Sequence, residues 1–174
     1  MAIVINLFGA PGTGKSTLAA GLFYHMKIKG MNCEMASEYI KDKFYEEAPY
    51  PYKDQLYTFA KQNKKIRQLY DKVDYIICDS PLLQGIVYEN KEPEVLKQTI
   101  LDYFNSYNNL NILLKRQHEY HQEGRVQTEQ EADMVGQQIQ DTLDRYNIEY
   151  KVMPTTRALE NILDIFHVLR KESK

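Results

Sequence analysis

The chain of 174 residues is poor in cysteine, in net charge and in long apolar runs. Its two cysteines, Cys33 and Cys78, form neither a disulfide framework nor a metal-ligand spacing, so we interpret both as ordinary strand cysteines. The 22 basic residues nearly balance the 24 acidic ones, which argues against a polyanion such as duplex DNA and favours small substrates. No apolar run approaches the roughly 20 residues that cross a bilayer.

The sequence also lacks internal repeats, low-complexity stretches and long linkers. The apolar segment at 2–8 has no basic flank, so it does not fit a signal peptide. We therefore expect a soluble cytoplasmic protein with one domain over 1–174, a length that buries roughly 70% of the surface exposed by an unfolded chain.

Residues 9–17 complete the phosphate-binding pattern G-x-x-x-x-G-K-[ST]. An apolar strand precedes them, and apolar residues at helical spacing follow, which is the strand–loop–helix context of this motif. Glycines allow successive backbone N–H groups to point at phosphate oxygens, and the helix start adds its positive dipole end. The predicted nucleotide-binding residues are Gly9, Ala10, Pro11, Gly12, Thr13, Gly14, Lys15, Ser16 and Thr17.

Three side chains of this loop have distinct expected roles. Lys15 is expected to reach the β- and γ-phosphates of ATP, and the Ser16 hydroxyl to bind Mg²⁺. Thr17 is expected to support the α-phosphate. The loop therefore predicts nucleoside triphosphate binding, but alone it does not separate a kinase from an NTP-driven switch.

The rest of the chain alternates apolar strands with amphipathic segments. Expected strands are 2–8, 32–36, 73–78, 110–114 and 148–153, and expected main helices are 15–29, 53–72, 92–105, 128–146 and 158–169. Thr128 and Glu131 have capping-box spacing. Crossovers of this length return the chain parallel, so we predict an α/β P-loop NTPase fold with a doubly wound, five-stranded parallel sheet and helices on both faces.

Two carboxylates follow expected strands. Asp79 ends the third strand. In phosphoryl-transfer enzymes an acidic residue at the end of a strand orders Mg²⁺ or contacts the acceptor hydroxyl, and Asp79 is the candidate for this role. Glu38 follows the second strand and is a candidate general base for the acceptor hydroxyl. The strand ends face the same cleft, so the sequence leaves the base open between Glu38 and Asp79. Ser16 and Asp79 are the predicted metal-binding residues.

The polar segment at 115–130 follows the fourth strand and is the expected lid. Arg116 and Arg125 lie in it, and guanidinium groups can neutralise the charge that develops during phosphoryl transfer. His118 and His121 lie in the same segment without a set of further ligands, so we interpret them as solvated side chains.

The assembled pattern resembles the NadR-like P-loop ATPase and kinase family, which includes ribosylnicotinamide kinase domains and small AAA-type ATPases, many of them from phages. The residues that carry the resemblance are Gly9 to Thr17, Ser37-Glu38-Tyr39, Asp79-Ser80-Pro81, Gly124-Arg125 and Ile148-Glu149-Tyr150. The segment from Arg116 to Arg125 also looks like the lid of nucleoside and nucleotide kinases. The resemblance implies the P-loop fold and transfer of the γ-phosphoryl group from ATP to a nucleoside-like acceptor.

The leading hypothesis is an ATP- and Mg²⁺-dependent kinase of a nucleoside, nucleotide or ribosylnicotinamide-like molecule. Its catalytic residues would be Lys15, Glu38, Asp79, Arg116 and Arg125. The alternative is an NTP-hydrolysing switch without a small-molecule acceptor. Phosphorylation of nucleic-acid 5′ ends is a third hypothesis, which the absence of a basic stripe disfavours. Residue order leaves the acceptor, the ATP or GTP preference and the oligomeric state open.

Overall fold

The computed structural model describes residues 1–39, 54–87, 93–117, 119–120 and 128–172, with side chains described up to residue 166. Five strands form one sheet in the order β2-β3-β1-β4-β5, and every neighbouring pair is parallel. The strands are β1 (Ile3–Phe8), β2 (Cys33–Ala36), β3 (Tyr75–Cys78), β4 (Asn108–Lys115) and β5 (Lys151–Pro154). This confirms the predicted doubly wound parallel sheet.

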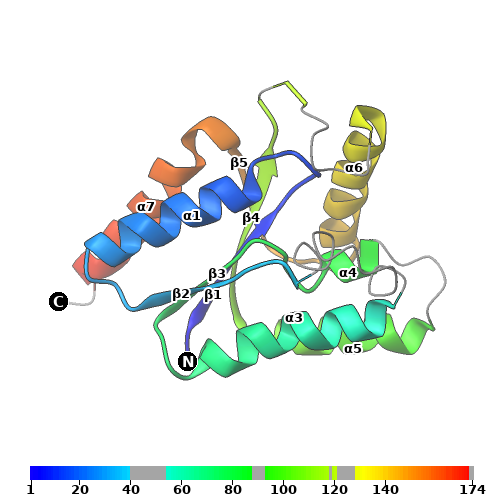
Figure 1. Ribbon diagram of the computed structural model, residues 1–174, viewed down its shortest axis with the longest axis horizontal. Coiled ribbons are helices and arrows are strands. Elements are labelled where there is room, and N and C mark those ends of the chain that lie inside the picture. Colours follow the sequence, from blue (N-terminus) through cyan, green and yellow to red (C-terminus); the bar gives the residue numbers. More distant parts are fainter. Residues whose placement is uncertain (40–53, 88–92, 118, 121–127, 173–174) are drawn as a thin grey trace.

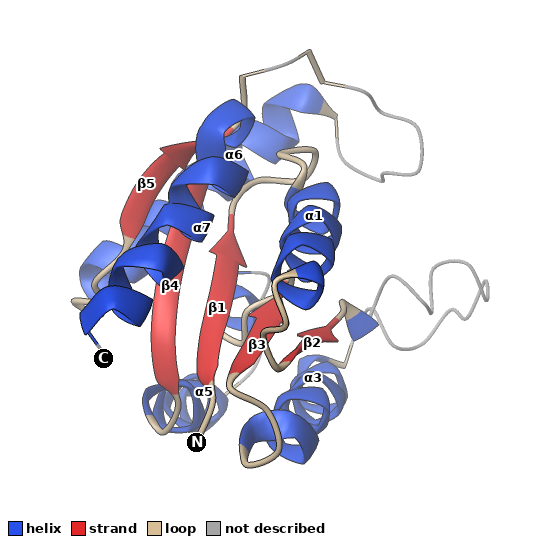
Figure 2. Ribbon diagram, turned by 90° about the vertical axis from the view of Figure 1, so that its left-hand side faces the viewer, coloured by secondary structure: helices blue, strands red, loops and turns tan. Residues whose placement is uncertain are grey.

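Helices cover both faces of the sheet, as Figures 1 and 2 show. One face packs against α1 (Lys15–Ile28) and α7 (Thr155–Glu172), which also contact each other. The other face packs against α3 (Gln55–Tyr70), α4 (Gln84–Val87), α5 (Glu94–Asn105) and α6 (Glu129–Arg145). Among the described residues, no helix is both long and apolar enough to span a membrane.

The central strand β1 joins the two cores because its side chains alternate between the faces. Val4 and Phe8 belong to the core under α3 to α6, whereas Ile5 and Leu7 belong to the core under α1 and α7. Asn6 is 1% exposed, and its amide donates hydrogen bonds of 2.9 Å to the side chains of Asn109 and Asn111 on β4. The buried amide is therefore satisfied, as burial requires.

The last strand and helix differ from the sequence expectation. Ile148 and Tyr150 suggested a strand from 148, but β5 begins at Lys151. Asn147 has a φ of 52°, and the N–H of Ile148 returns to the carbonyl of Leu143. Residues 148–150 therefore complete the exit from α6 and pack Ile148 and Tyr150 on the core without strand pairing. Helix α7 begins at Thr155, three residues before the expected start at 158.

The carboxyl ends of the parallel strands meet at one edge of the sheet, where ligands bind in open α/β sheets. Gly9 follows β1, Glu38 lies two residues beyond β2, Asp79 follows β3, and Arg116 follows β4. The topology thus brings the residues of four predicted site segments to this edge.

Candidate functional site

The phosphate-loop pattern forms the turn between β1 and α1. Gly9, Gly12 and Gly14 have φ angles of 155°, 79° and 82°, in the region that side chains disfavour. At Gly9 a Cβ atom would also lie 2.8 Å from Thr13 Oγ1 and 3.2 Å from the Leu114 carbonyl oxygen. Conformation and crowding therefore both require glycine at the start of the loop. The helix α1 then begins at Lys15, with Gly14 as its N-cap.

Lys15 folds back over its own loop. Its Nζ donates hydrogen bonds to the carbonyl oxygens of Gly9 at 2.8 Å and Ala10 at 2.9 Å. The Thr13 hydroxyl also donates to the Ala10 carbonyl at 2.9 Å. These contacts place the ammonium group within the loop whose N–H groups and helix start favour an anion. Ser16 and Thr17 lie in the first turn of α1, next to Lys15.

Asp79 is the buried carboxylate of the site. It follows β3, which pairs directly with β1, and it is 5% exposed. Its Oδ1 is buried and has no hydrogen-bond partner among the described residues. Burial of a carboxylate oxygen without a donor is costly, so this atom is suited to a cation or a substrate donor.

The donor set fits Mg²⁺ at this edge of the sheet. Within the described ranges, no group of three His, Cys, Asp or Glu residues forms a metal cage. Mg²⁺ does not need one, because it commonly takes one or two protein oxygens together with phosphate oxygens and water. Asp79 and the Ser16 hydroxyl would be the protein oxygens in such an arrangement.

The structure brings Glu38 to the same region as Asp79. Ala36, the last residue of β2, pairs with Cys78, the last residue of β3, so the two carboxylates lie just beyond neighbouring strand ends. Burial, together with the negative charges of Asp79 and Glu38, raises the pKa of the Cys78 thiol to about 12. Both carboxylates therefore act on the same thiol, which belongs to the hydrophobic core. Glu38 itself is half-buried.

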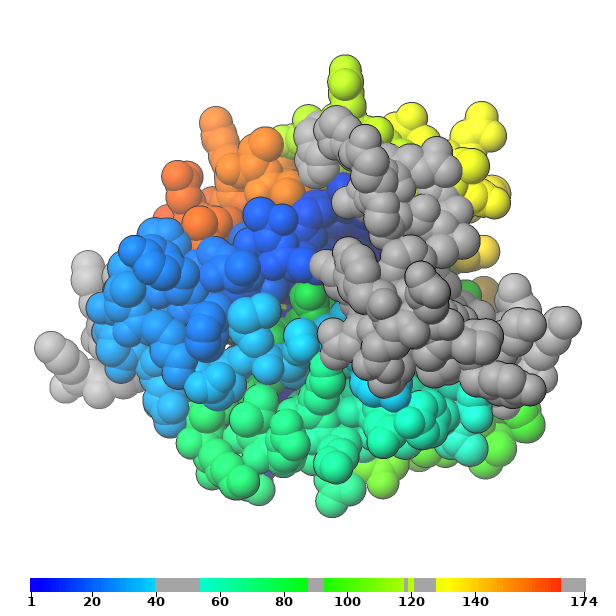
Figure 3. Space-filling model, viewed as in Figure 1, coloured from blue at the N-terminus to red at the C-terminus, as the bar shows by residue number. Residues whose placement is uncertain are grey.

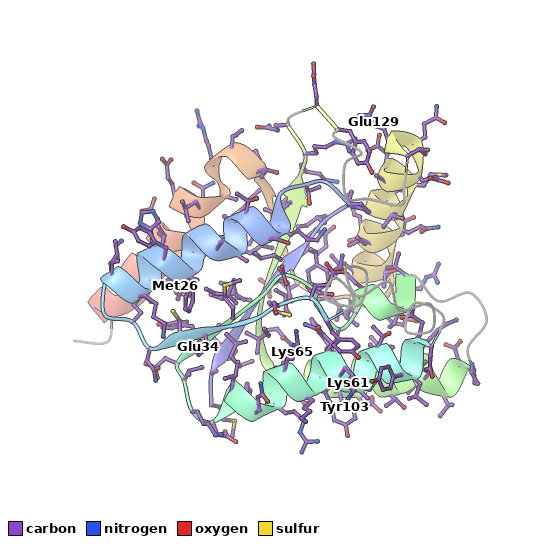
Figure 4. All side chains as sticks on the ribbon, viewed as in Figure 1. Met26, Glu34, Lys61, Lys65, Tyr103 and Glu129 are labelled. Carbon is purple, nitrogen blue, oxygen red and sulfur yellow. The ribbon has the colours of Figure 1, made fainter. Side chains whose placement is uncertain are left out.

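Arg116 is fixed by the first turns of α6. Its Nη2 lies 3.2 Å from Glu129 Oε1 and 2.5 Å from Asp133 Oδ1, and its guanidinium lies 5.0 Å from the Tyr120 ring centroid. Figure 4 labels Glu129 at the start of this helix. Arg116 Nη1 is buried and has no hydrogen-bond partner in the part of the chain that the structure describes. Arg125, His118 and His121 lie outside the described residues.

A cavity of about 250 Å³ lies between the phosphate loop, the end of β4 and α6. Its walls include Ala10 and Thr13 of the loop, Arg116, and Asp133 and Gly136 of α6. The cavity thus joins the predicted phosphate-binding loop to one of the two predicted lid arginines. The space suits a polar ligand, because backbone and charged side chains surround it.

A family model described as an AAA domain matches residues 4–160. The chain belongs to this AAA domain family. Among curated proteins, none matches the sequence. This family and the observed fold confirm the predicted resemblance to the NadR-like P-loop ATPase and kinase family.

Three solved structures share the fold of this AAA domain. The deoxyadenosine kinase of M. mycoides, solved with dCMP and dCDP, is 18% identical with a TM-score of 0.58, over 95% of this chain and 99% of that one. The thymidylate kinase of Ehrlichia chaffeensis is 13% identical with a TM-score of 0.66, over 95% and 98%. The NadR protein, solved with NR, is 18% identical with a TM-score of 0.65, over 88% of this chain and 43% of that one.

Several contacts at the candidate site of this AAA domain have no signal in the sequence. The Gln84 side chain on α4 donates to the Gly9 carbonyl at 3.4 Å. The Thr155 hydroxyl lies 3.1 Å from the Thr13 carbonyl and 2.9 Å from the Lys115 carbonyl, and can donate to either. A threonine after a proline carries no sequence pattern that predicts these Thr155 contacts. Thr155 begins α7, and in the space-filling view the orange surface of α7 adjoins the blue surface that includes α1 (Figure 3).

Proposed function

We propose that this AAA domain is an ATP- and Mg²⁺-dependent kinase that transfers the γ-phosphoryl group to a nucleoside, nucleotide or ribosylnicotinamide-like acceptor. The observation that carries the proposal is the pair of carboxylates at the sheet edge. Asp79 has a buried oxygen without a partner among the described residues, and Glu38 follows the neighbouring strand. A switch needs the phosphate loop and one metal-ordering acid, whereas a second carboxylate at this edge suits an acceptor hydroxyl.

In the proposed reaction the acceptor oxygen forms a bond to the γ-phosphorus, and the bond from that phosphorus to the β,γ-bridging oxygen breaks, which leaves ADP. The proton of the acceptor hydroxyl passes to the general base, which is Glu38 or Asp79. Mg²⁺, held by Ser16 and Asp79, would neutralise the charge of the phosphates.

The remaining predicted residues bind and neutralise the phosphates. Lys15 would turn from the loop carbonyls to the β- and γ-phosphates, and Ser16 with Asp79 would bind the metal. Arg116 lines the cavity beside the loop, so its guanidinium can face phosphate charge there. We propose that the segment 115–130, which contains Arg125, is the lid of the site. The proposed enzyme is a single domain over 1–174.

The test is a transfer assay with γ-labelled ATP. The chain is incubated with Mg²⁺ and a panel of nucleosides, nucleoside monophosphates and nicotinamide riboside, and labelled products are separated. We expect at least one labelled acceptor, with loss of transfer in Lys15→Ala and in excess chelator. Lys72→Ala removes an exposed lysine outside the site and serves as the matched control. Far-UV circular dichroism checks that both variants are folded.

The assay also separates the kinase from the switch. A kinase transfers label to an acceptor, whereas a switch releases labelled phosphate to water at the same slow rate with every member of the panel. No labelled acceptor from any member of the panel would overturn the proposed kinase activity.

A further inference from the structure

Glu38 lies in a short segment that one buried side chain holds at both ends. The strand β2 ends at Ala36, so strand pairing no longer fixes the backbone at Ser37 and Glu38. The Tyr39 N–H donates to Gln62 Oε1 at 3.0 Å, and Gln62 Nε2 lies 3.4 Å from the Ala36 carbonyl oxygen, to which it donates. A single amide thus binds the backbone immediately before and immediately after Ser37 and Glu38.

Gln62 also links this segment to the neighbouring strand. It lies on α3 and is 5% exposed, and its Nε2 is 3.8 Å from Cys78 Sγ at the end of β3. The Cys78 thiol in turn lies 3.3 Å from the Ser80 carbonyl oxygen, to which it donates. One glutamine has one oxygen acceptor and two N–H donors, so it can serve all three contacts together. The contacts connect the strand ends that carry Glu38 and Asp79.

A second contact from the same helix supports the segment from the solvent side. Lys65 Nζ donates to the carbonyl oxygen and the hydroxyl of Ser37 at 3.0 and 3.1 Å, one turn along α3 from Gln62. Figure 4 labels Lys65 on this helix. These bonds are exposed, so water competes with them, whereas the bonds of Gln62 are buried or half-buried.

We infer that Gln62 is a positioning residue, which fixes the Glu38 carboxylate for proton transfer by holding the backbone on both sides of it. The inference rests on the proposed kinase function and assigns the base role to Glu38. A general base must lie within hydrogen-bonding reach of its proton, and a misplacement of about 1 Å can cost roughly 100-fold in rate. Gln62 would act through Glu38 and would touch neither nucleotide nor acceptor.

The experiment uses two buried amides that are adjacent on α3. Gln62→Met keeps an unbranched side chain and removes all three polar contacts. Asn63→Leu is the matched control, because Asn63 is 6% exposed and its Oδ1 accepts from the Tyr107 hydroxyl, away from Glu38. We expect both variants to lower Tm, but only Gln62→Met to lower kcat, by about 10- to 100-fold. We expect the Kd for an ATP analogue to stay unchanged in both variants. The number of analogue-binding sites also gives the concentration of folded enzyme from which kcat is calculated.

A double-mutant cycle with Glu38→Gln tests whether Gln62 acts through Glu38. If it does, Gln62→Met with Glu38→Gln transfers phosphate no more slowly than Glu38→Gln alone. Additive losses would overturn the inference, as would a kcat for Gln62→Met equal to that of Asn63→Leu. If Gln62→Met does not fold, Gln62→Glu, which keeps the acceptor for Tyr39 N–H, is judged by the same criteria.

The two proposals fail in different ways. Transfer by the wild-type chain with an unchanged rate in Gln62→Met overturns the positioning role alone. Absence of transfer from the wild-type chain to every acceptor overturns the kinase proposal and the positioning role with it.

Discussion

Replacement of Gly136 by alanine tests whether α6 forms a wall of the proposed nucleotide site. Gly136 lies in α6 and lines the cavity, and a Cβ atom there would lie 3.1 Å from the Ala10 Cβ of the phosphate loop. Gly21 in α1 provides the matched control, because its added Cβ would meet only Leu159 methyl groups at 3.6 Å, an ordinary contact. Both substitutions replace glycine by alanine within a helix, so both gain helix propensity of roughly 0.5–1 kcal/mol.

The two variants differ in crowding. The Ala10 Cβ is attached directly to the loop backbone, so the loop or α6 must shift by a few tenths of an ångström, and overpacking of this kind costs about 1–3 kcal/mol. We expect Gly21→Ala to stabilise the protein and Gly136→Ala to be less stable than Gly21→Ala by about 1–3 kcal/mol. If the loop shifts, the affinity for an ATP analogue falls about 5- to 10-fold in Gly136→Ala, which is roughly 1 kcal/mol.

Urea unfolding gives the free energies, and calorimetric titration with an ATP analogue gives the affinities. The wild-type chain and Gly21→Ala are expected to bind the analogue equally well. Equal stabilisation of both variants with unchanged affinity would refute the reasoning, because it would mean that the loop accommodates the methyl group without moving.

Two further predictions concern the helix cap of α6 and the buried thiol. Thr128→Ala removes the capping box, in which the Glu131 N–H donates to Thr128 Oγ1 and the Thr128 N–H to Glu131 Oε2, and should lower the free energy of unfolding by about 1 kcal/mol. Thr142→Ala, whose hydroxyl only returns to the Gln138 carbonyl, should be near neutral in the same urea titration. The Cys78 pKa is raised from 9.0 to about 12 by burial, so an unfolded chain loses this proton at lower pH than the folded one. The stabilisation from the protonated Cys78 thiol is present below pH 9 and is lost as the pH rises toward 12. Between these values the unfolding free energy of the wild type should fall more steeply with pH than that of Cys78→Ala, by up to about 1.4 kcal/mol per pH unit. Parallel curves of unfolding free energy against pH would contradict this.

Local patterns account for the parts of the molecule that the sequence predicted. The loop from Gly9 to Thr17 is defined by residue types at fixed spacing, and its three glycines have the positive φ angles that this pattern requires. The capping box at Thr128 and Glu131 is equally local, and the structure confirms it. The order of strands and helices follows from apolar periodicity, so the parallel sheet was predictable as well.

The contacts between distant segments were not predictable in the same way. The bond from Gln84 to Gly9 spans 75 residues, and the bond from Gln62 to Ala36 spans 26. A buried glutamine within a helix rich in lysine has the same sequence pattern as a solvated one, so only the fold reveals that Gln62 faces inward. The start of β5 was mispredicted for a related reason, since apolar residues can pack on the core without pairing in the sheet.

The resting contacts of Lys15 bear on whether it can serve as the phosphate-binding cation. Lys15 Nζ donates to the carbonyls of Gly9 and Ala10, and both carbonyls would lose that donor if Lys15 turned to a phosphate. Each has a second donor in place. The Gly9 carbonyl accepts from Gln84 Nε2 at 3.4 Å, and the Ala10 carbonyl accepts from the hydroxyl and the N–H of Thr13 at 2.9 and 3.3 Å.

Because those donors remain, movement of Lys15 would leave neither carbonyl unsatisfied, and the usual penalty of about 1–3 kcal/mol for an orphaned buried group would not arise. The same argument gives a role to two buried polar side chains, Gln84 beside the loop at 5% exposure and Thr13 within it at 2% exposure. They stabilise the loop in the geometry that Lys15 would leave behind, which favours a loop that is preorganised for phosphate over one that must rebuild itself on binding.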